Sequence, residues 1–233
     1  MSERRSIGAF GLLALIALML LPAVPAAATS HGPGVFPPQS QPFGKSYGEW
    51  SALWWQQALA VDAGRHPNPF DQGLVPCNLG TSNVRFLVGT TGGDAYRACA
   101  IPAGKAILLP LINGECSRIE GNGTTEAELR ACARAQADNF GELHARVDGR
   151  RIPDLARFRF ASPLFSFRSV SGNPFAVPAT PPGQPSPSVA DGYWVMLEPL
   201  RPGLHTIKFG GAAPAFGFET SATYVIAVLP QRG

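Results

Sequence analysis

The chain has 233 residues, four cysteines and a formal net charge of +3, and these totals exclude several classes of protein. So small a positive charge, with no block of lysine or arginine, argues against nucleic acid or a strongly acidic molecule as the partner. About 205 residues remain after the N-terminal segment described next is removed, which suits one sizeable domain.

The N-terminus has the features of a secretory signal peptide, residues 1–28. Arg4 and Arg5 come first, an apolar run follows at 7–21, and three alanines at 26–28 supply an A-x-A cleavage site. The apolar run is too short for a membrane span and no second one follows, so we expect no membrane anchor in the mature chain. Export to the periplasm or the medium is therefore predicted.

The mature chain begins with a leader, residues 29–44, whose glycines and prolines indicate an extended segment. A helix is predicted over 45–61, because Ser46 and Glu49 have the spacing of a capping box and apolar residues then recur at helical intervals. Thr125 opens a second capping box, which predicts a second helix.

Most of the other segments have the length and alternation of short strands, and we predict roughly seven or eight of them. The glycine-rich stretch GTTGGD suggests a hairpin between strands at 84–89 and 96–101, and the dipeptide Asp148-Gly149 marks another. Pro110 places its apolar strand at the edge of a sheet or ends it early.

The last third of the chain combines a proline-rich loop with closing strands. Six prolines in 171–191 indicate a long excursion rather than a central strand. Strands at 193–198 and 204–209 flank the turn PLRPG, and a third at 222–229 closes the chain. These elements predict a mainly β fold with two helices: an antiparallel β-sandwich, immunoglobulin-like or jelly-roll-like, in a single domain over 45–233.

Four cysteines in an exported chain predict two disulfides. Cys77–Cys99 and Cys116–Cys132 are favoured among the three possible pairings, because each closes a short local loop worth about 3 kcal/mol in the chain-entropy account. A four-cysteine zinc site is the alternative, but no C-x-x-C pair is present and export favours oxidation. The helices and disulfides would then elaborate the sandwich, and no metal or cofactor is expected.

Four stretches of the mature chain resemble known sequences: SYGEWSALWWQQAL, RFLVGTTGG, CAIPAGKAILLPLIN and LRPGLHTIKFGG. With these motifs the chain resembles an uncharacterised family of secreted bacterial proteins. No activity is established for that family, so the resemblance implies export but no mechanism. The stretch DGYWVMLEPLRPGLHTIKFGG is separately similar to the closing hairpins of immunoglobulin-like extracellular domains, a similarity of fold without functional content.

Three of the four tryptophans lie within six residues of the first predicted helix. Trp50 and Trp54 belong to its apolar stripe, and we expect them in the core. Trp55 is offset by about 100° from Trp54, so it either widens the buried face or binds a ligand at its margin beside Gln56. An aromatic platform of this kind would suit a glycan or the envelope surface as partner.

Glu49 and Glu115 are candidates for catalytic carboxylates. As a pair they could serve a glycoside hydrolase, whose two acids stand roughly 5–10 Å apart. The alternatives are a cap, with Glu49 returning to the Ser46 amide, and for Glu115 an Asn-Gly turn that leads into a disulfide. Asn113, in the same stretch as Glu115, could project into a cleft and bind a ligand.

The four histidines show no H-x-H or H-E-x-x-H spacing, so no local metal motif is present. His66, in a loop rich in proline, is a candidate ligand-binding residue. His205, in a closing strand, is a candidate catalytic residue. The G-x-S-x-G motif of serine hydrolases is absent.

Three functions fit these observations. The first is an exported, non-catalytic protein that binds a ligand or a surface, such as a glycan, through a sandwich scaffold. The second is a secreted hydrolase of glycans or esters that uses Glu49 and Glu115. The third is a structural or assembly protein of the cell envelope whose interface is the segment 171–191. The lack of a catalytic signature favours the first.

Overall fold

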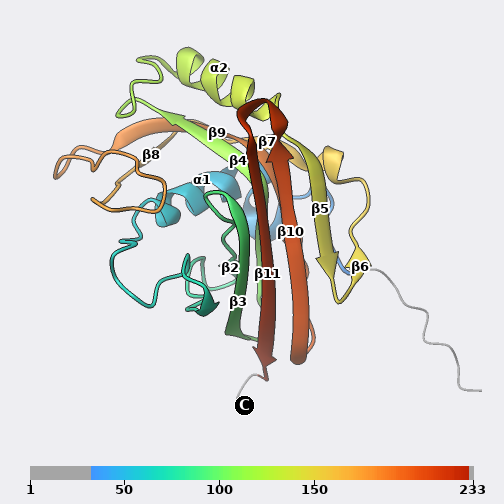
Figure 1. Cartoon of the computed structure of the whole chain (residues 1–233). Helices are drawn as coiled ribbons and strands as arrows, with labels where there is room; N and C mark the ends of the chain where they lie inside the picture. Colours follow the sequence, from blue (N-terminus) through green and yellow to red (C-terminus); the bar gives the residue numbers. More distant parts are fainter. Residues whose placement is uncertain (1–32, 231–233) are drawn as a thin grey trace, which may run out of the picture. The chain divides into compact units, whose positions relative to one another are not determined.

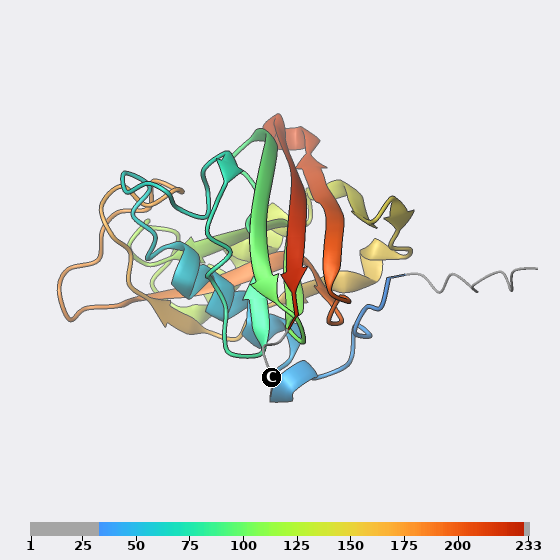
Figure 2. The ribbon, with the colours of Figure 1, turned by 90° about the horizontal axis from the view of Figure 1, so that it is seen from below.

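The structure is a computed structural model that describes residues 33–230, so the predicted signal peptide lies outside the described residues. The described chain is mainly β with two α-helices, as predicted, and its strands form two sheets (Figure 1). Figure 2 shows the strands of one sheet crossing in front of those of the other. A sandwich-like arrangement of two sheets is therefore present.

The outer sheet has six strands, in the order β1 (Gly73–Leu74), β3 (Gly93–Pro102), β11 (Phe218–Leu229), β10 (Gly203–Ala213), β5 (Gly141–Val147) and β6 (Arg150–Arg151). The inner sheet has the order β2 (Val84–Phe86), β4 (Ala106–Ser117), β9 (Ser186–Leu197) and β7 (Arg159–Ala161), and β8 (Phe165–Phe167) also pairs with β9. The helices are α1 (Tyr47–Ala58), α2 (Glu126–Ala137) and the short 3-10 helices Pro42–Gly44, Leu155–Phe158 and Pro214–Phe216.

Both sheets are mixed, where a wholly antiparallel sandwich was expected. β3 runs parallel to both β1 and β11, and β2 runs parallel to β4. The other neighbours are antiparallel. The β1–β3 and β2–β4 pairs are parallel because β1 to β4 follow one another in the chain but alternate between the two sheets, so each pair is joined through a strand of the other sheet.

The hairpin expected between 84–89 and 96–101 is wrong, because β2 and β3 lie in different sheets. The glycine-rich stretch carries the chain across, and Gly92 and Gly93 take the positive φ angles of 135° and 72° that this path needs. PLRPG likewise joins β9 to β10 across the sheets. The hairpin at Asp148-Gly149 is confirmed, since it joins the antiparallel strands β5 and β6.

Two prolines lie inside central strands, against expectation. Pro110 is in β4, between β2 and β9, where the register with β9 shifts at a bulge. The pairing with β2 ends at Leu108, so on that side no ladder hydrogen bond is lost at Pro110. Pro187 is the second residue of β9, a position that tolerates proline. The proline-rich excursion therefore ends before Ser186 rather than at 191.

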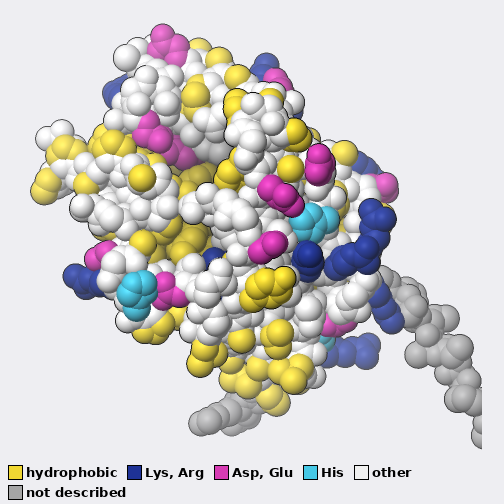
Figure 3. All heavy atoms as spheres, in the orientation of Figure 1, with side chains coloured by type: hydrophobic (Ala, Val, Ile, Leu, Met, Phe, Trp, Pro, Cys, Tyr) yellow, Lys and Arg dark blue, Asp and Glu magenta, His cyan; other side chains and the backbone are white. Residues whose placement is uncertain are grey.

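The inner sheet is covered on both faces. α1 packs on β9, β7 and β8, α2 packs on β4 and β9, and β10 lies against β4. β4 is accordingly buried along nearly its whole length, whereas β3 and β11 alternate between buried and exposed residues. The outer sheet thus has one face toward the core and one toward solvent, where Leu204, Val225 and Leu229 are exposed. Figure 3 shows hydrophobic side chains on this surface, over the lower part of the view.

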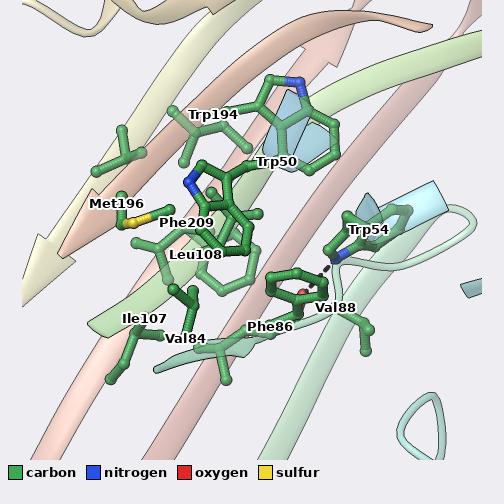
Figure 4. Packing of buried hydrophobic residues seen from close by; sticks show 14 of the residues in the cluster. Trp50, Trp54, Val84, Phe86, Val88, Ile107, Leu108, Trp194, Met196 and Phe209 are labelled. Atoms are coloured by element: carbon green, nitrogen blue, oxygen red, sulfur yellow. Dashed lines mark hydrogen bonds between the residues drawn. The ribbon is translucent and has the colours of Figure 1, made fainter. Parts of the chain in front are cut away.

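Both helices begin with the predicted capping boxes, at Ser46 and Thr125. Trp50 and Trp54 are buried in the core, as expected, and each is only 2% exposed (Figure 4). The Nε1–H of Trp50 donates to the carbonyl of Pro42 at 3.0 Å, and that of Trp54 donates to the carbonyl of Leu87 at 2.8 Å. The tryptophan stripe therefore holds α1 through both apolar area and hydrogen bonds.

The two favoured disulfides, Cys77–Cys99 and Cys116–Cys132, are confirmed. The described part of the leader follows the end of β9 at its start and ends in the 3-10 helix Pro42–Gly44, so it is extended only in part. The Phe36 amide donates to Met196 at 3.0 Å, and the Glu198 amide donates to Gly34 at 2.9 Å. No helix within residues 33–230 is long and apolar enough to cross a membrane.

Gly48→Ala tests the packing of α1. A β-carbon at Gly48 would overlap the carbonyl oxygen of Ala161, which is backbone and cannot yield as a side chain could. We expect the substitution to lower the free energy of unfolding by about 1–3 kcal/mol, although alanine has the better helix propensity. Urea denaturation measures the change. Gly141→Ala, where a β-carbon meets open space, is the control, and an equal effect in both variants would contradict the packing.

Candidate functional site

A cavity of about 390 Å³ lies between α1, β4 and the proline-rich segment. We call it the aromatic cavity, because its walls are formed largely by the rings of Trp54, Trp55, Phe70, Phe175 and Phe218. Hydroxyl and amide groups line another part of it, from Thr90, Thr91, Asn113 and Thr220. Its volume and its mixture of rings with a few polar groups are typical of small-molecule sites.

Phe175 is the ring around which the aromatic walls are organised. Its centroid lies 4.9 Å from that of Trp55 and 5.5 Å from that of Phe70. Trp54 and Trp55 in turn meet edge to face at 5.1 Å. Each contact adds to the apolar area that the rings bury, so the walls support one another without a ligand.

Asn173 fastens the proline-rich segment that carries Phe175. Its side-chain amide donates to the carbonyls of Val170 and Val177, at 2.8 and 2.7 Å. Its side-chain oxygen accepts from the amides of Phe175 and Val177, each at 3.2 Å. A buried asparagine bonded in this way replaces the ladder that a strand would have provided. These four hydrogen bonds therefore hold the loop wall of the cavity in a defined conformation.

The polar wall contains two threonine hydroxyls that are bonded to each other and one asparagine side chain that has no such partner among the described residues. The hydroxyls of Thr90 and Thr220 are 2.9 Å apart, and the Thr90 amide also donates to the Thr220 hydroxyl at 3.1 Å. Asn113 is half-buried in β4, and its side-chain amide makes no hydrogen bond with residues 33–230. It can both donate and accept, so it is free to orient a ligand.

Two of the predicted ligand-binding residues, Trp55 and Asn113, come together in the aromatic cavity. Gln56 does not line it. The Gln56 side chain instead donates to the carbonyl of Ser166 at 2.8 Å and so ties α1 to β8. His66 is exposed in its loop, where Nδ1 lies 2.8 Å from the carboxylate of Asp71, and it does not line the cavity either.

His205 is held by hydrogen bonds to two residues near it, Asp148 and Arg201. Its Nδ1 lies 2.8 Å from the Asp148 carboxylate and its Nε2 lies 2.9 Å from the carbonyl oxygen of Arg201. Burial opposes protonation, but the bonds to Asp148 and Arg201 outweigh it and raise the pKa of His205. The pair joins β10 to the β5–β6 turn and is not part of the aromatic cavity.

Glu49 serves as the cap that the capping box predicts. Its carboxylate accepts from the backbone amide of Ser46 at 2.8 Å and from the Ser46 hydroxyl at 2.8 Å. These bonds to the backbone and the hydroxyl lower the pKa of Glu49, which favours the carboxylate over the acid. Such a group is a poor proton donor, and it does not line the aromatic cavity.

Glu115 is 7% exposed and lies in β4, opposite Ala190 of β9. The Asn-Gly turn expected here is therefore wrong, because Asn113 and Gly114 continue the strand. The Ser188 hydroxyl donates to its carboxyl. Burial, followed by the neighbouring Glu120 carboxyl, raises the pKa of Glu115 to about 9. Glu115 is thus a protonated, buried acid that does not reach the aromatic cavity.

Sequence patterns did not single out Phe70, Phe175, Thr220 or Phe218, which complete the cavity. Phe70 and Phe175 belong to loops that are 105 positions apart, and no local periodicity connects them. No group of three or more histidine, cysteine, aspartate or glutamate side chains among residues 33–230 is placed to hold a metal ion.

Comparison with known proteins adds little to this geometry. No family model matches the chain, and no curated protein matches it. Among solved structures, a chain from the "Structure of PbICP-C in complex with falcipain-2" is 10% identical to it and has a TM-score of 0.26. The alignment covers 64% of this chain and 100% of that chain. So low a TM-score supports no argument about fold or function.

Trp54→Phe and Trp55→Phe together test how the cavity walls are held. Both remove the same atoms, but Trp54 loses a buried hydrogen bond to Leu87, whereas the buried Nε1–H of Trp55 has no partner within residues 33–230. We expect Trp54→Phe to be the more destabilising by about 1–2 kcal/mol in urea unfolding. Equal losses, or a larger loss for Trp55→Phe, would contradict this assignment.

Glu115→Gln tests the buried acid. The unfolded carboxyl titrates near 4.5, whereas the folded pKa is about 9, so the wild type loses stability as the pH rises between these values. Glutamine stays neutral. We expect the variant to be more stable than the wild type by about 1–3 kcal/mol at pH 7.5 and to gain little at pH 4.

Thermal and urea unfolding at both pH values measure this difference. Glu219→Gln, which alters an exposed carboxylate of β11, is the control. A gain for Glu115→Gln that is the same at pH 4 and pH 7.5 would show that the buried acid is not the cause.

Proposed function

We propose that the mature protein is an exported, non-catalytic binding protein whose site is the aromatic cavity. The observation that carries this proposal is a cavity of about 390 Å³ with mutually supporting rings and a free amide at Asn113. Rings bind the flat apolar face of a small ligand, and one or two polar groups fix its orientation. The ligand class is a compact molecule with one such face.

The cavity lining favours binding over catalysis. None of the lining residues is an aspartate, glutamate, histidine, lysine or arginine, so no side chain there can act as a general acid or base. Glu49 is engaged in its cap and Glu115 lies beside the Cys116–Cys132 disulfide. The hydrolase alternative therefore has no support from the placement of these two carboxylates.

Export is supported by three observations of different kinds. The N-terminal sequence has the order of a signal peptide, the two disulfides are consistent with an oxidising compartment, and the motifs resemble secreted bacterial proteins.

A glycan is retained as a ligand class to be tested. Trp55 is only 5% exposed, so a compact ring fits the site better than an extended polysaccharide does.

A ligand panel with a blocked variant tests the proposed site. Indole and benzyl alcohol represent compact rings, and N-acetylglucosamine represents sugars. We expect saturable quenching of tryptophan fluorescence by at least one ring compound. Thr91→Phe should weaken that binding at least about tenfold, because it places a ring at the cavity in a residue that is otherwise exposed.

Thr206→Phe is the matched control, since Thr206 is exposed on β10 and does not line the cavity. Binding that Thr91→Phe leaves intact would place the site elsewhere. Binding of the sugar alone, lost in Thr91→Phe, would assign the cavity to glycans.

A further inference from the structure

A second, smaller cavity of about 170 Å³ adjoins the aromatic cavity. The two share part of their lining: Phe70, Thr90, Thr91 and Pro174. The smaller cavity is the more polar one, because Gln72 and Arg97 also line it. A ligand that fills the aromatic cavity therefore has a polar compartment within reach of a short extension.

Arg97 brings a buried positive charge to this compartment. It lies on the inward face of β3 and is 5% exposed. Its Nε–H donates to the carbonyl of Asp71 at 2.7 Å, and Nη2 donates to the carbonyl of Phe70 at 3.0 Å. Nη1 donates to the carbonyls of Val88 and Gly89, at 2.9 and 3.0 Å, and to the Tyr224 hydroxyl at 3.2 Å. Among residues 33–230, Nη2 has Phe70 as its one acceptor, so the second of its two N–H groups is not engaged there.

This guanidinium has no counter-ion among residues 33–230: no carboxylate lies within the 4.0 Å of an ion pair. The carboxylate of Asp71 instead contacts Nδ1 of His66 and accepts a hydrogen bond from the backbone amide of Asn68. Asp94 also lines the smaller cavity, but it is three positions from Arg97 on β3, so its side chain leaves the strand on the opposite, exposed face and does not pair with the guanidinium. Carbonyl dipoles, the Tyr224 hydroxyl and the Tyr224 ring, whose centroid is 5.6 Å from Cζ, compensate this charge without a carboxylate. A buried charge that lacks a counter-ion is costly and attracts an anion.

We infer that the natural ligand carries a carboxylate, which binds beside Arg97 while its ring occupies the aromatic cavity. This inference rests on the proposed function. The carboxylate accepts the remaining N–H of Nη2 and supplies the missing counter-charge. Thr90 lines both cavities and so belongs to the boundary between them. The ligand class is an aromatic acid with a short chain, and the arginine selects it against neutral rings.

Two probes of equal size isolate the charge. 3-Phenylpropionate and 3-phenylpropanamide differ only in the carboxylate, and calorimetry at pH 7.5 and low ionic strength gives the dissociation constant of each. We expect the wild type to bind the acid at least about tenfold more tightly than the amide. In Arg97→Gln the preference should fall to about one. Arg146→Gln, an exposed arginine of β5, should keep it.

Arg97 also holds the loops around the cavity, so Arg97→Gln could fail to fold. In that case nuclear magnetic resonance of the wild type tests the inference. The Arg97 Nε–H resonance should shift on addition of the acid and should not shift on addition of the amide. Equal affinity for acid and amide would overturn the inference and leave the proposed function standing. An acid preference unchanged in folded Arg97→Gln would also overturn it. If neither these probes nor the neutral ring compounds bind, the proposed function itself fails.

Discussion

The inner sheet is apolar on both faces, so both must be covered, and the positions of α1 and of the outer sheet follow from this constraint. β4 is apolar from Ala106 to Ile112 and buried throughout that stretch. The outer sheet covers one face and the tryptophans of α1 cover the other. Where that helical cover ends, Trp55 meets Phe175 from a loop, and the space left between them is the aromatic cavity. The site is a product of the packing rather than an addition to it.

Arg97 plays the complementary part on the outer sheet. One side chain joins the carbonyls of Phe70 and Asp71 in one loop to those of Val88 and Gly89 in another. These loops belong to the walls of both cavities. The same guanidinium that positions them also keeps a charge without a counter-ion beside the site. Structural fastening and ligand selection can therefore share one residue, at the cost of burying its charge.

Features decided within a few residues were predictable from the sequence. The capping boxes at Ser46 and Thr125, the hairpin at Asp148-Gly149 and both disulfides depend on local spacing, and each is as expected. Trp55 and Asn113, which line the aromatic cavity, were singled out from the sequence because one is offset from a helical stripe and the other ends an apolar run. The sheet to which β3 belongs and the convergence of Phe70 on Phe175 depend on long-range pairing, which leaves no local pattern.

The central claim is that a compact ring binds between α1 and the proline-rich segment. Intermolecular nuclear Overhauser effects between 3-phenylpropionate and the mature protein test it most directly. The account predicts effects from the ring protons of the ligand to Trp55 and Phe175. Effects confined to the exposed apolar residues of the outer sheet, Leu204 and Leu229, would contradict it, because they would place the ligand on the solvent face and leave the cavity empty.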